Sequence, residues 1–392
     1  MSIGWQEAAL LALAVVVLGV LLWLILRGRP DFDQSEDPYV EGLELWLAGD
    51  HKAAIEAMRR AVDRSPSSVD PYLQLGHFLR RTGDARRATA LHRSLAARKG
   101  LARTKMNSIL LALAEDLIVL GSWNEAGQIL TDLQKQKPTS VRFWKTRFHQ
   151  HVGAGQDSDA AETLKLALKR VPEDQRKALR ADLAIFQLDR GLIAIRDGRP
   201  GDARHLVNDA AKYDADPARS AYVRALSELA DDDPARAART STDGLLAAPD
   251  HSELLLPVLQ KALLLTGHYE RSIPILESAC ETAEAPPSLW IALAMLHEKL
   301  GDRELAIRLL ESKAGDERLT LDAAAPFLKI LVNDLPDCDF RRIWEGLHAR
   351  TGPVSWHCQS CGHRLSEVRW HCPACRALDT IVAGAPHPGT DS

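Results

Sequence analysis

The chain has 392 residues, of which 26% are charged and 5% aromatic, and its formal net charge is −4. This length allows two or three folded units, and the low aromatic content beside abundant Ala, Leu and Arg favours an all-helical chain. So small a net charge gives no electrostatic basis for binding nucleic acid, which is therefore excluded as an expected partner.

The first predicted element is a membrane-spanning helix. Residues 8–26 are nineteen residues without a charge or a proline, and as a helix they would extend about 28 Å, close to the thickness of the hydrocarbon core. A cleaved signal peptide is the alternative, but no basic residue precedes the stretch and no small-x-small site follows it. Arg27 and Arg29 follow it, and Glu7 is the only charge before it. The positive-inside rule therefore places the rest of the chain in the cytoplasm, with residues 1–30 as a single-pass anchor and its juxtamembrane segment.

A repeat of about 34 residues fills the region 36–351. Seven glycines each have a small residue five positions later, and an Asp–Ala pair fills the one gap in the series. The pairs are Gly49–Ala54, Gly83–Ala88, Gly121–Ala126, Gly155–Ala160, Gly198–Ala203, Asp232–Ala237, Gly267–Ser272 and Gly301–Ala306, with successive spacings of 34, 38, 34, 43, 34, 35 and 34. This period is typical of tetratricopeptide repeats, in which a first helix A and a second helix B form a hairpin that stacks into a solenoid. We therefore predict about eight such repeats.

Single repeats carry the same physical pattern. Between Tyr72 and Leu79 the apolar residues fall on one face of helix A, Gly76 lets helix B approach, and Gly83 ends helix A. Other repeats show the same offsets in the sets Gly42/Ala54/Pro66, Ala114/Ala126/Pro138 and Phe148/Ala160/Pro172, in which Phe148 is a bulky departure. We expect each proline to mark the end of a helix B. A degenerate helical pair from Leu319 to Arg350 is expected to cap the array.

Residues 354–384 contain the strongest chemical signal. Cys358-x-x-Cys361 is followed, after ten residues, by Cys372-x-x-Cys375. Each pair suits a tight turn that directs two sulfurs at one ion, and two such turns complete a tetrahedral thiolate shell for zinc or iron. The alternative is two disulfides or four unconnected thiols, which this paired spacing disfavours. A reducing cytoplasm would also keep the thiols free. We predict one metal ion, zinc or iron, held by these four cysteines.

Residues that flank the cysteines are assigned supporting roles. Trp356 and Trp370 each precede the first cysteine of a pair by two residues, and we expect them to stabilise a module too small for a large core; a partner-binding tryptophan is the alternative. The module is expected to dock on the repeat array, ahead of a tail at 385–392. Four thiolates already fill the shell, so the neighbouring histidines are not expected to be ligands: these are His357, His363 and His371.

No catalytic residue is predicted. The sequence contains no Gly-rich phosphate loop, no Gly-x-Ser-x-Gly elbow and no His-Glu-x-x-His motif. The isolated histidines and cysteines are expected to be packing or ordinary polar residues, namely His92, His149, His151, His205, His297, Cys280 and Cys338. A solenoid offers a groove that binds proteins, so we expect a non-enzymatic protein whose groove residues the sequence does not identify.

The order of these parts resembles the lipopolysaccharide assembly protein B family of the Gram-negative inner membrane. The resemblance rests on the anchor, on Asp37-Pro-Tyr39-Val40-x-Gly42, on Leu75-Gly76-x-Phe78-x-Arg80-Arg81-x-Gly83 with His92, and on Cys-x-x-Cys-Gly…Trp370-His371-Cys372-Pro373-x-Cys375-Arg376. It covers nearly the whole chain and is most specific in the rubredoxin-like C-terminal module, whereas the middle repeats are generic.

The resemblance implies a regulator rather than an enzyme. Members of the family restrain lipopolysaccharide synthesis together with the membrane-bound ATP-dependent protease FtsH, by promoting degradation of the deacetylase that commits precursor to lipid A. A lipopolysaccharide-sensing inner-membrane protein antagonises them. The resemblance implies these three partners, an inner-membrane location and a metal site at Cys358, Cys361, Cys372 and Cys375; it identifies no groove residue.

Two other functions remain open at the level of sequence. A general scaffold for envelope-synthesis enzymes would need the same anchor and the same groove. A rubredoxin-like redox protein would use an iron centre to carry an electron, although no flavin or nicotinamide motif accompanies the four cysteines.

Overall fold

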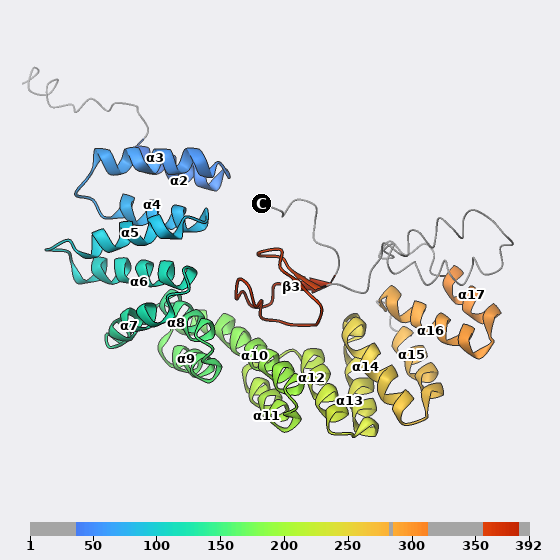
Figure 1. The fold of residues 1–392 in the computed structure, drawn as a ribbon. Coiled ribbons are helices and arrows are strands. Elements are labelled where there is room, and N and C mark those ends of the chain that lie inside the picture. Colours follow the sequence, from blue (N-terminus) through green and yellow to red (C-terminus); the bar gives the residue numbers. More distant parts are fainter. Residues whose placement is uncertain (1–36, 282–284, 313–355, 384–392) are drawn as a thin grey trace, which may run out of the picture. The chain divides into compact units, whose positions relative to one another are not determined.

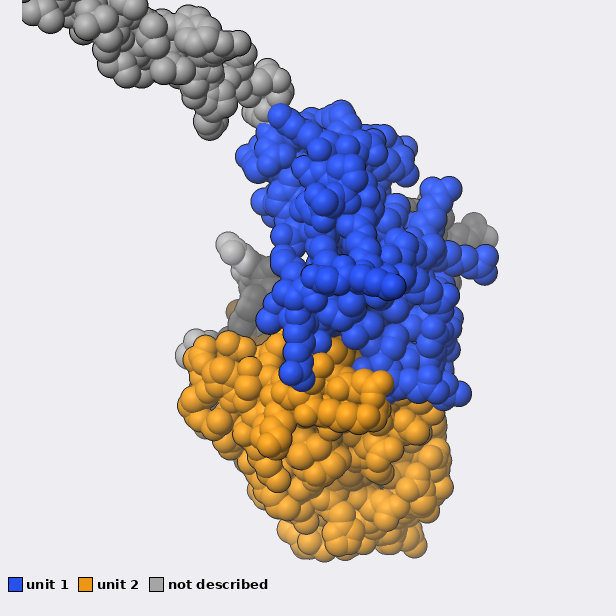
Figure 2. All heavy atoms as spheres, turned by 90° about the vertical axis from the view of Figure 1, so that its left-hand side faces the viewer, with its two compact units in different colours: residues 1–129 blue, residues 130–392 orange. Residues whose placement is uncertain are grey.

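A computed structural model describes residues 37–281, 285–312 and 356–383. The chain divides into two compact units, residues 1–129 and 130–392 (Figure 2). The predicted anchor at 8–26, the predicted capping pair from Leu319 to Arg350 with Cys338, and the tail at 385–392 lie outside the described residues. Within the described ranges, no helix combines the length and apolar character needed to span a membrane.

The described helices form successive pairs joined by short turns, as the 34-residue period predicts (Figure 1). The pairs are α2 (Pro38–Leu47) with α3 (His51–Arg64), α4 (Asp70–Arg81) with α5 (Ala85–Ala96), α6 (Arg103–Val119) with α7 (Trp123–Gln134), α8 (Val141–Gly153) with α9 (Asp157–Arg170), α10 (Glu173–Arg196) with α11 (Pro200–Ala210), α12 (Pro217–Ala230) with α13 (Pro234–Ala247), α14 (Ser252–Leu265) with α15 (Ser272–Cys280), and α16 (Pro287–Leu300) with α17 (Arg303–Glu311). Short 3-10 turns lie at Ala211–Tyr213, Pro249–His251 and Tyr269–Arg271.

The turn inside each pair has the conformation that the sequence pattern requires. The seven predicted glycines have φ between 72° and 94°, a left-handed region that favours glycine. Asp232, which fills the gap in the glycine series, has φ 60° and takes the same conformation. All eight small residues five positions later are 0% exposed. Each second helix therefore packs through a side chain small enough to allow close approach.

Helix ends explain both the predicted prolines and the irregular spacings. Helices α3, α7 and α9 end at Arg64, Gln134 and Arg170, two to four residues before the predicted prolines. The spacings of 38 and 43 arise because α6 has 17 residues and α10 has 24, whereas α4 has 12. The longer repeats therefore lengthen their first helix instead of inserting a loop.

At Gly76, α4 leaves no room for a side chain beside α5. A Cβ atom at this position would lie 2.4 Å from Nε2 of His92. His92 is fully buried, and its Nδ1 lies 2.5 Å from Oδ2 of Asp116. Asp116 also accepts a hydrogen bond of 2.6 Å from Arg80. His92 is therefore held rigidly inside the first unit, which agrees with its predicted role as a packing residue.

We expect Gly76→Ala to destabilise the first unit by about 1–3 kcal/mol, because the added methyl group clashes with an imidazole ring that cannot move away. Urea unfolding followed by circular dichroism measures the effect. Gly201→Ala is the matched control, since the nearest atom to its added Cβ is Nη2 of Arg204, 3.9 Å away. Equal stability of the two variants would contradict the close contact at Gly76.

The C-terminal module belongs to the second unit and contains a three-stranded antiparallel sheet. The strands β1 (Trp356–Cys358), β2 (Arg364–Leu365) and β3 (Ile381–Ala383) lie in the order β2-β1-β3. Trp356 pairs with Leu365 on one side and with Ala383 on the other. We call residues 356–383 the ribbon; it lies beside α10 and α12 (Figure 1).

Candidate metal centre

Two similar turns carry the four cysteines. In the first turn the N–H of Gly362 donates to the carbonyl of Cys358 at 2.8 Å, and in the second the N–H of Arg376 donates to the carbonyl of Cys372 at the same distance. Gly362 and Arg376 each follow the second cysteine of a pair, and both have a left-handed φ, 71° and 63°. The two turns therefore present their sulfurs in related geometries, although only the first has a glycine, Gly362, at its left-handed position.

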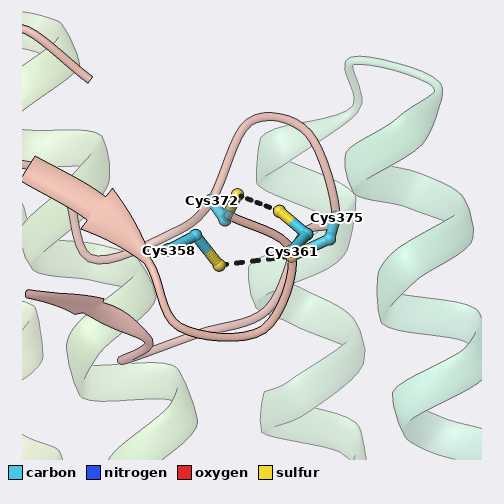
Figure 3. Close-up of side chains that lie close together, drawn as sticks. All are labelled: Cys358, Cys361, Cys372 and Cys375. Atoms are coloured by element: carbon cyan, nitrogen blue, oxygen red, sulfur yellow. Dashed lines mark hydrogen bonds between the residues drawn. The ribbon is translucent and has the colours of Figure 1, made fainter. Parts of the chain in front are cut away.

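The four sulfurs converge on one point (Figure 3). All four Sγ atoms lie within 4.8 Å of one another. Sγ of Cys358 is 3.5 Å from that of Cys375, and Sγ of Cys361 is 3.7 Å from that of Cys372. A tetrahedral zinc site with bonds of about 2.3 Å separates its sulfurs by about 3.8 Å, so this arrangement fits one ion. The four cysteines form no disulfides, and the predicted site for one metal ion is confirmed.

Hydrogen bonds to sulfur favour the charged form of Cys358 and partly offset the effect of burial at Cys372 and Cys375. The hydroxyl of Thr380 lies 3.1 Å from Sγ of Cys358. Burial opposes ionisation of Cys358, but the Thr380 hydroxyl and the backbone N–H groups of Ser360 and Cys361 outweigh it and lower the pKa of this thiol to about 6. Burial raises the pKa of both Cys372 and Cys375, although backbone N–H groups also donate to their sulfurs. These donors orient the sulfurs and offset part of the charge that four thiolates would bring to one ion.

The flanking histidines are not part of the ligand group. Among the described residues, the group placed to hold a metal ion consists of the four cysteines and includes no histidine. His371 is buried and lies edge-on to Phe186 of α10, at 5.9 Å between ring centroids. Burial lowers the pKa of His371, so its neutral form is favoured. A closed shell of four sulfurs leaves no open position for substrate, which is typical of a structural site.

Trp370 attaches the ribbon to the helical array. Its side chain is 4% exposed and packs in one cluster with Leu188 of α10, Val223 of α12 and Leu254 of α14. This corrects the expectation that both tryptophans form the interior of the metal module. Trp356 is half-buried and contacts both the ribbon's own core and this cluster, whereas Trp370 is buried by the helices. The expected docking of the module on the array is observed, and Trp370 is its main apolar contact.

A buried carboxylate on α10 secures this docking. Asp189 is 1% exposed and accepts hydrogen bonds from Nε and Nη2 of Arg369, at 2.8 and 2.7 Å. It also accepts a hydrogen bond of 3.0 Å from the backbone N–H of Trp370. The hydrogen bond with Asp189 raises the pKa of Arg369, which keeps this partly buried guanidinium charged. A bidentate pair of this kind fixes orientation as well as distance.

Sequence reasoning missed Asp189 and Arg369. Asp189 lies three residues after the buried Phe186, so its carboxylate occupies a core-facing position of α10. This core-facing position is the sequence signal that Asp189 needs a buried partner. It does not indicate that the partner, Arg369, lies 180 residues away in the ribbon. Two exposed contacts add to the docking: Arg219 bonds Asp379 at 2.6 Å, and Arg196 lies 3.5 Å from Glu367.

Comparison with known proteins supports both parts of this architecture. The family model for the zinc ribbon of LapB, described as a rubredoxin metal binding domain, matches residues 356–383. A tetratricopeptide repeat model matches residues 39–68. No curated protein matches the chain.

Similar solved structures include two tetratricopeptide repeat proteins. One, from Thermus thermophilus, is 20% identical, covers 45% of this chain and 89% of its own, and has a TM-score of 0.34. The other, from Parabacteroides merdae, is 13% identical, covers 75% of this chain and 97% of its own, and has a TM-score of 0.31.

These family matches agree with the resemblance: residues 356–383 are similar to the rubredoxin-like zinc ribbon of LapB, and residues 39–68 are similar to a tetratricopeptide repeat. Arrays of this kind are protein-interaction scaffolds, and neither matching family is an enzyme family.

Proposed function

We propose that this protein is a membrane-anchored adaptor that regulates lipopolysaccharide synthesis, by promoting FtsH-dependent degradation of the deacetylase of the lipid A pathway. The observation that carries the proposal is the ribbon itself. It matches the LapB zinc ribbon over residues 356–383 and is joined to the array through the buried Asp189–Arg369 pair. A metal module that is fixed to a protein-binding array suits recognition of partners better than electron transfer.

The predicted anchor supplies the second part of the proposal. A single span at residues 8–26 would keep the array in the membrane that also holds the protease. Tethering of this kind raises the effective concentration of the two proteins, to the millimolar range for short flexible links, without requiring tight contacts. The small residue Gly19 within the span would permit close packing with another membrane helix, such as that of the protease or of the lipopolysaccharide-sensing antagonist.

Reconstitution in proteoliposomes tests the role of the tether. FtsH, the deacetylase and ATP are combined with the full chain or with a form lacking residues 1–26, and the loss of deacetylase is followed with time. We expect the full chain to accelerate degradation at least tenfold, and the shortened form to have a much smaller effect because it must find the protease from solution. Undiminished acceleration by the shortened form would show that the tether is incidental.

The same assay separates the adaptor from a general scaffold. A scaffold would bind the deacetylase and leave its rate of degradation unchanged. Binding without acceleration, measured by co-flotation of the deacetylase with the proteoliposomes, would therefore contradict the proposed function.

A further inference from the structure

A partly open cavity lies where the ribbon meets the array, within the second unit. Its volume is about 170 Å³, and its walls come from α10, α12 and the ribbon segment 367–369. The apolar wall consists of half-buried side chains: Leu192, Ile193 and Ile195 of α10, Leu226 of α12, and Val368 of the ribbon. No single part of the chain forms this cavity, because the array provides one side of it and the ribbon the other.

The size of the cavity indicates its occupant. A volume of 170 Å³ is more than ten times what one water molecule needs, about 10–15 Å³. It is smaller than the roughly 300–1,000 Å³ that sites for drug-sized ligands occupy. An apolar space between these limits suits a single large side chain.

The rim of the cavity carries balanced charge. Arg196 and Glu367 lie 3.5 Å apart with more than half of each side chain exposed, so this loose pair retains donors and acceptors for another group. Arg369 is already neutralised by Asp189. Because the pair has no net charge, it gives neither an anionic headgroup nor a basic side chain a net attraction. A peptide backbone, which is neutral and has both a donor and an acceptor, complements the pair.

Tyr222 adds a polar group to this otherwise apolar wall. Its ring lies edge-on to that of Trp370, at 6.2 Å between centroids, and it also lines the cavity. Burial and the charge of Glu367 raise the pKa of Tyr222, so its hydroxyl stays neutral and able to donate a hydrogen bond. The wall thus has the apolar surface with few polar groups that is usual for a binding site.

We propose that this cavity receives one leucine or phenylalanine side chain of a partner polypeptide, whose backbone crosses the rim at Arg196 and Glu367. The inference rests on the proposed function as a protein-binding adaptor and gives that adaptor a specific anchor point. The proposal also gives the metal a role in forming the cavity. The segment 367–369 ends three residues before Cys372, so a ribbon without metal would not complete the cavity.

Photolabelling tests the proposal on the full chain in lipid nanodiscs. The probe is the acetylated amide of photo-leucine, a leucine analogue that carries a diazirine, and labelled positions are mapped by mass spectrometry after irradiation. We expect labels in α10, α12 and segment 367–369, and at least a fivefold reduction when excess acetyl-leucine amide is present. Acetyl-aspartate amide should not compete, because its charged side chain would have to enter the apolar part of the cavity.

Two variants and one control make the test specific. Leu226→Trp and Val368→Trp fill the cavity from its two sides, and each should reduce labelling at least fivefold. Leu264→Trp is the control, because Leu264 lies on α14, is 66% exposed and does not line the cavity; it should leave labelling unchanged. Two cavity-filling variants are used so that a folding defect in one, detected by circular dichroism and metal content, does not decide the result.

Three results would overturn the proposal. Labelling that persists in both filled variants would place the probe elsewhere, and equal competition by acetyl-aspartate amide would show that the cavity does not select an apolar side chain. Competition by short-chain phosphatidylglycerol but not by acetyl-leucine amide would assign the cavity to a lipid acyl chain. Each of these would leave the deacetylase assay in proteoliposomes unaffected, whereas failure of the adaptor function would appear in that assay whatever the labelling shows.

Discussion

Replacing Cys372 with serine is expected to release the metal ion and unfold the ribbon, while the helices of the array remain folded. A ribbon of this size has little core of its own, since only Ile381 and the two buried cysteines, Cys358 and Cys372, form its buried cluster. Metal ligation contributes about 10–16 kcal/mol of apparent folding energy in small zinc domains, so a ribbon without metal cannot remain folded. Unfolding would also withdraw Trp370 and uncover Leu188 and Leu254 on the array.

Metal analysis, far-ultraviolet circular dichroism and hydrogen exchange measure these effects separately. We expect metal content to fall from about one ion per chain to near zero, helical content to change little, and amides of residues 356–383 to exchange freely. A colourless wild-type protein with bound zinc supports the structural role, whereas a red protein would point to iron and reopen the redox alternative. His363→Ala is the matched control, because His363 is exposed, lies two residues from Cys361 and is not in the ligand group. Retention of metal and of full regulation by Cys372→Ser would contradict the account.

Asp189→Asn is expected to detach the ribbon without removing its metal. The substitution keeps the size of the side chain but removes the charge that neutralises Arg369, whose side chain is 12% exposed. Breaking a buried ion pair in this way costs about 3–5 kcal/mol, because the remaining charge is left buried and unpaired. The four cysteines belong entirely to the ribbon and are untouched, so the metal should remain bound.

Hydrogen exchange at the backbone N–H of Trp370 provides a direct measurement, since this group donates to Asp189. The loss of about 3–5 kcal/mol should raise the fraction of detached ribbon, and with it the rate of exchange, by about two orders of magnitude or more. Glu367→Gln is the control, because the ion pair of Glu367 with Arg196 is exposed, and such pairs contribute about 0–1 kcal/mol. A similar effect of both substitutions, or loss of metal from Asp189→Asn, would show that the buried pair does not hold the ribbon in place.

Local features of this fold could be predicted because they depend on single residues. A left-handed turn favours glycine, and the close approach of two helices requires a small residue, so the positions of the helix pairs follow from the sequence. Even Asp232, which departs from glycine, was identified by its place in the series and has the expected φ of 60°. The metal site was predictable for the same reason. Each Cys-x-x-Cys turn is formed by neighbouring residues, and only the approach of the two turns to each other depends on the fold of the ribbon.

Contacts between distant segments could not be predicted from these patterns. Trp370 occupies the same place as Trp356 relative to its cysteine pair, yet it is buried against the array, because α10, α12 and α14 offer it an apolar surface. Asp189 and Arg369 are ordinary charged residues in the sequence, and only the folded chain brings them within 2.7 Å. The cavity beside them has walls from three segments, so no motif in any one of them could reveal it.

The measurement that tests the central claim most directly is the cellular half-life of the lipid A deacetylase. It is compared in cells that contain this protein, in cells depleted of it, and in cells that contain only its Cys358→Ser/Cys361→Ser form. We predict that depletion lengthens the half-life several-fold and that the serine form does not restore it, because the ribbon no longer folds onto the array. A half-life that is the same in all three would contradict the account and favour a general scaffold.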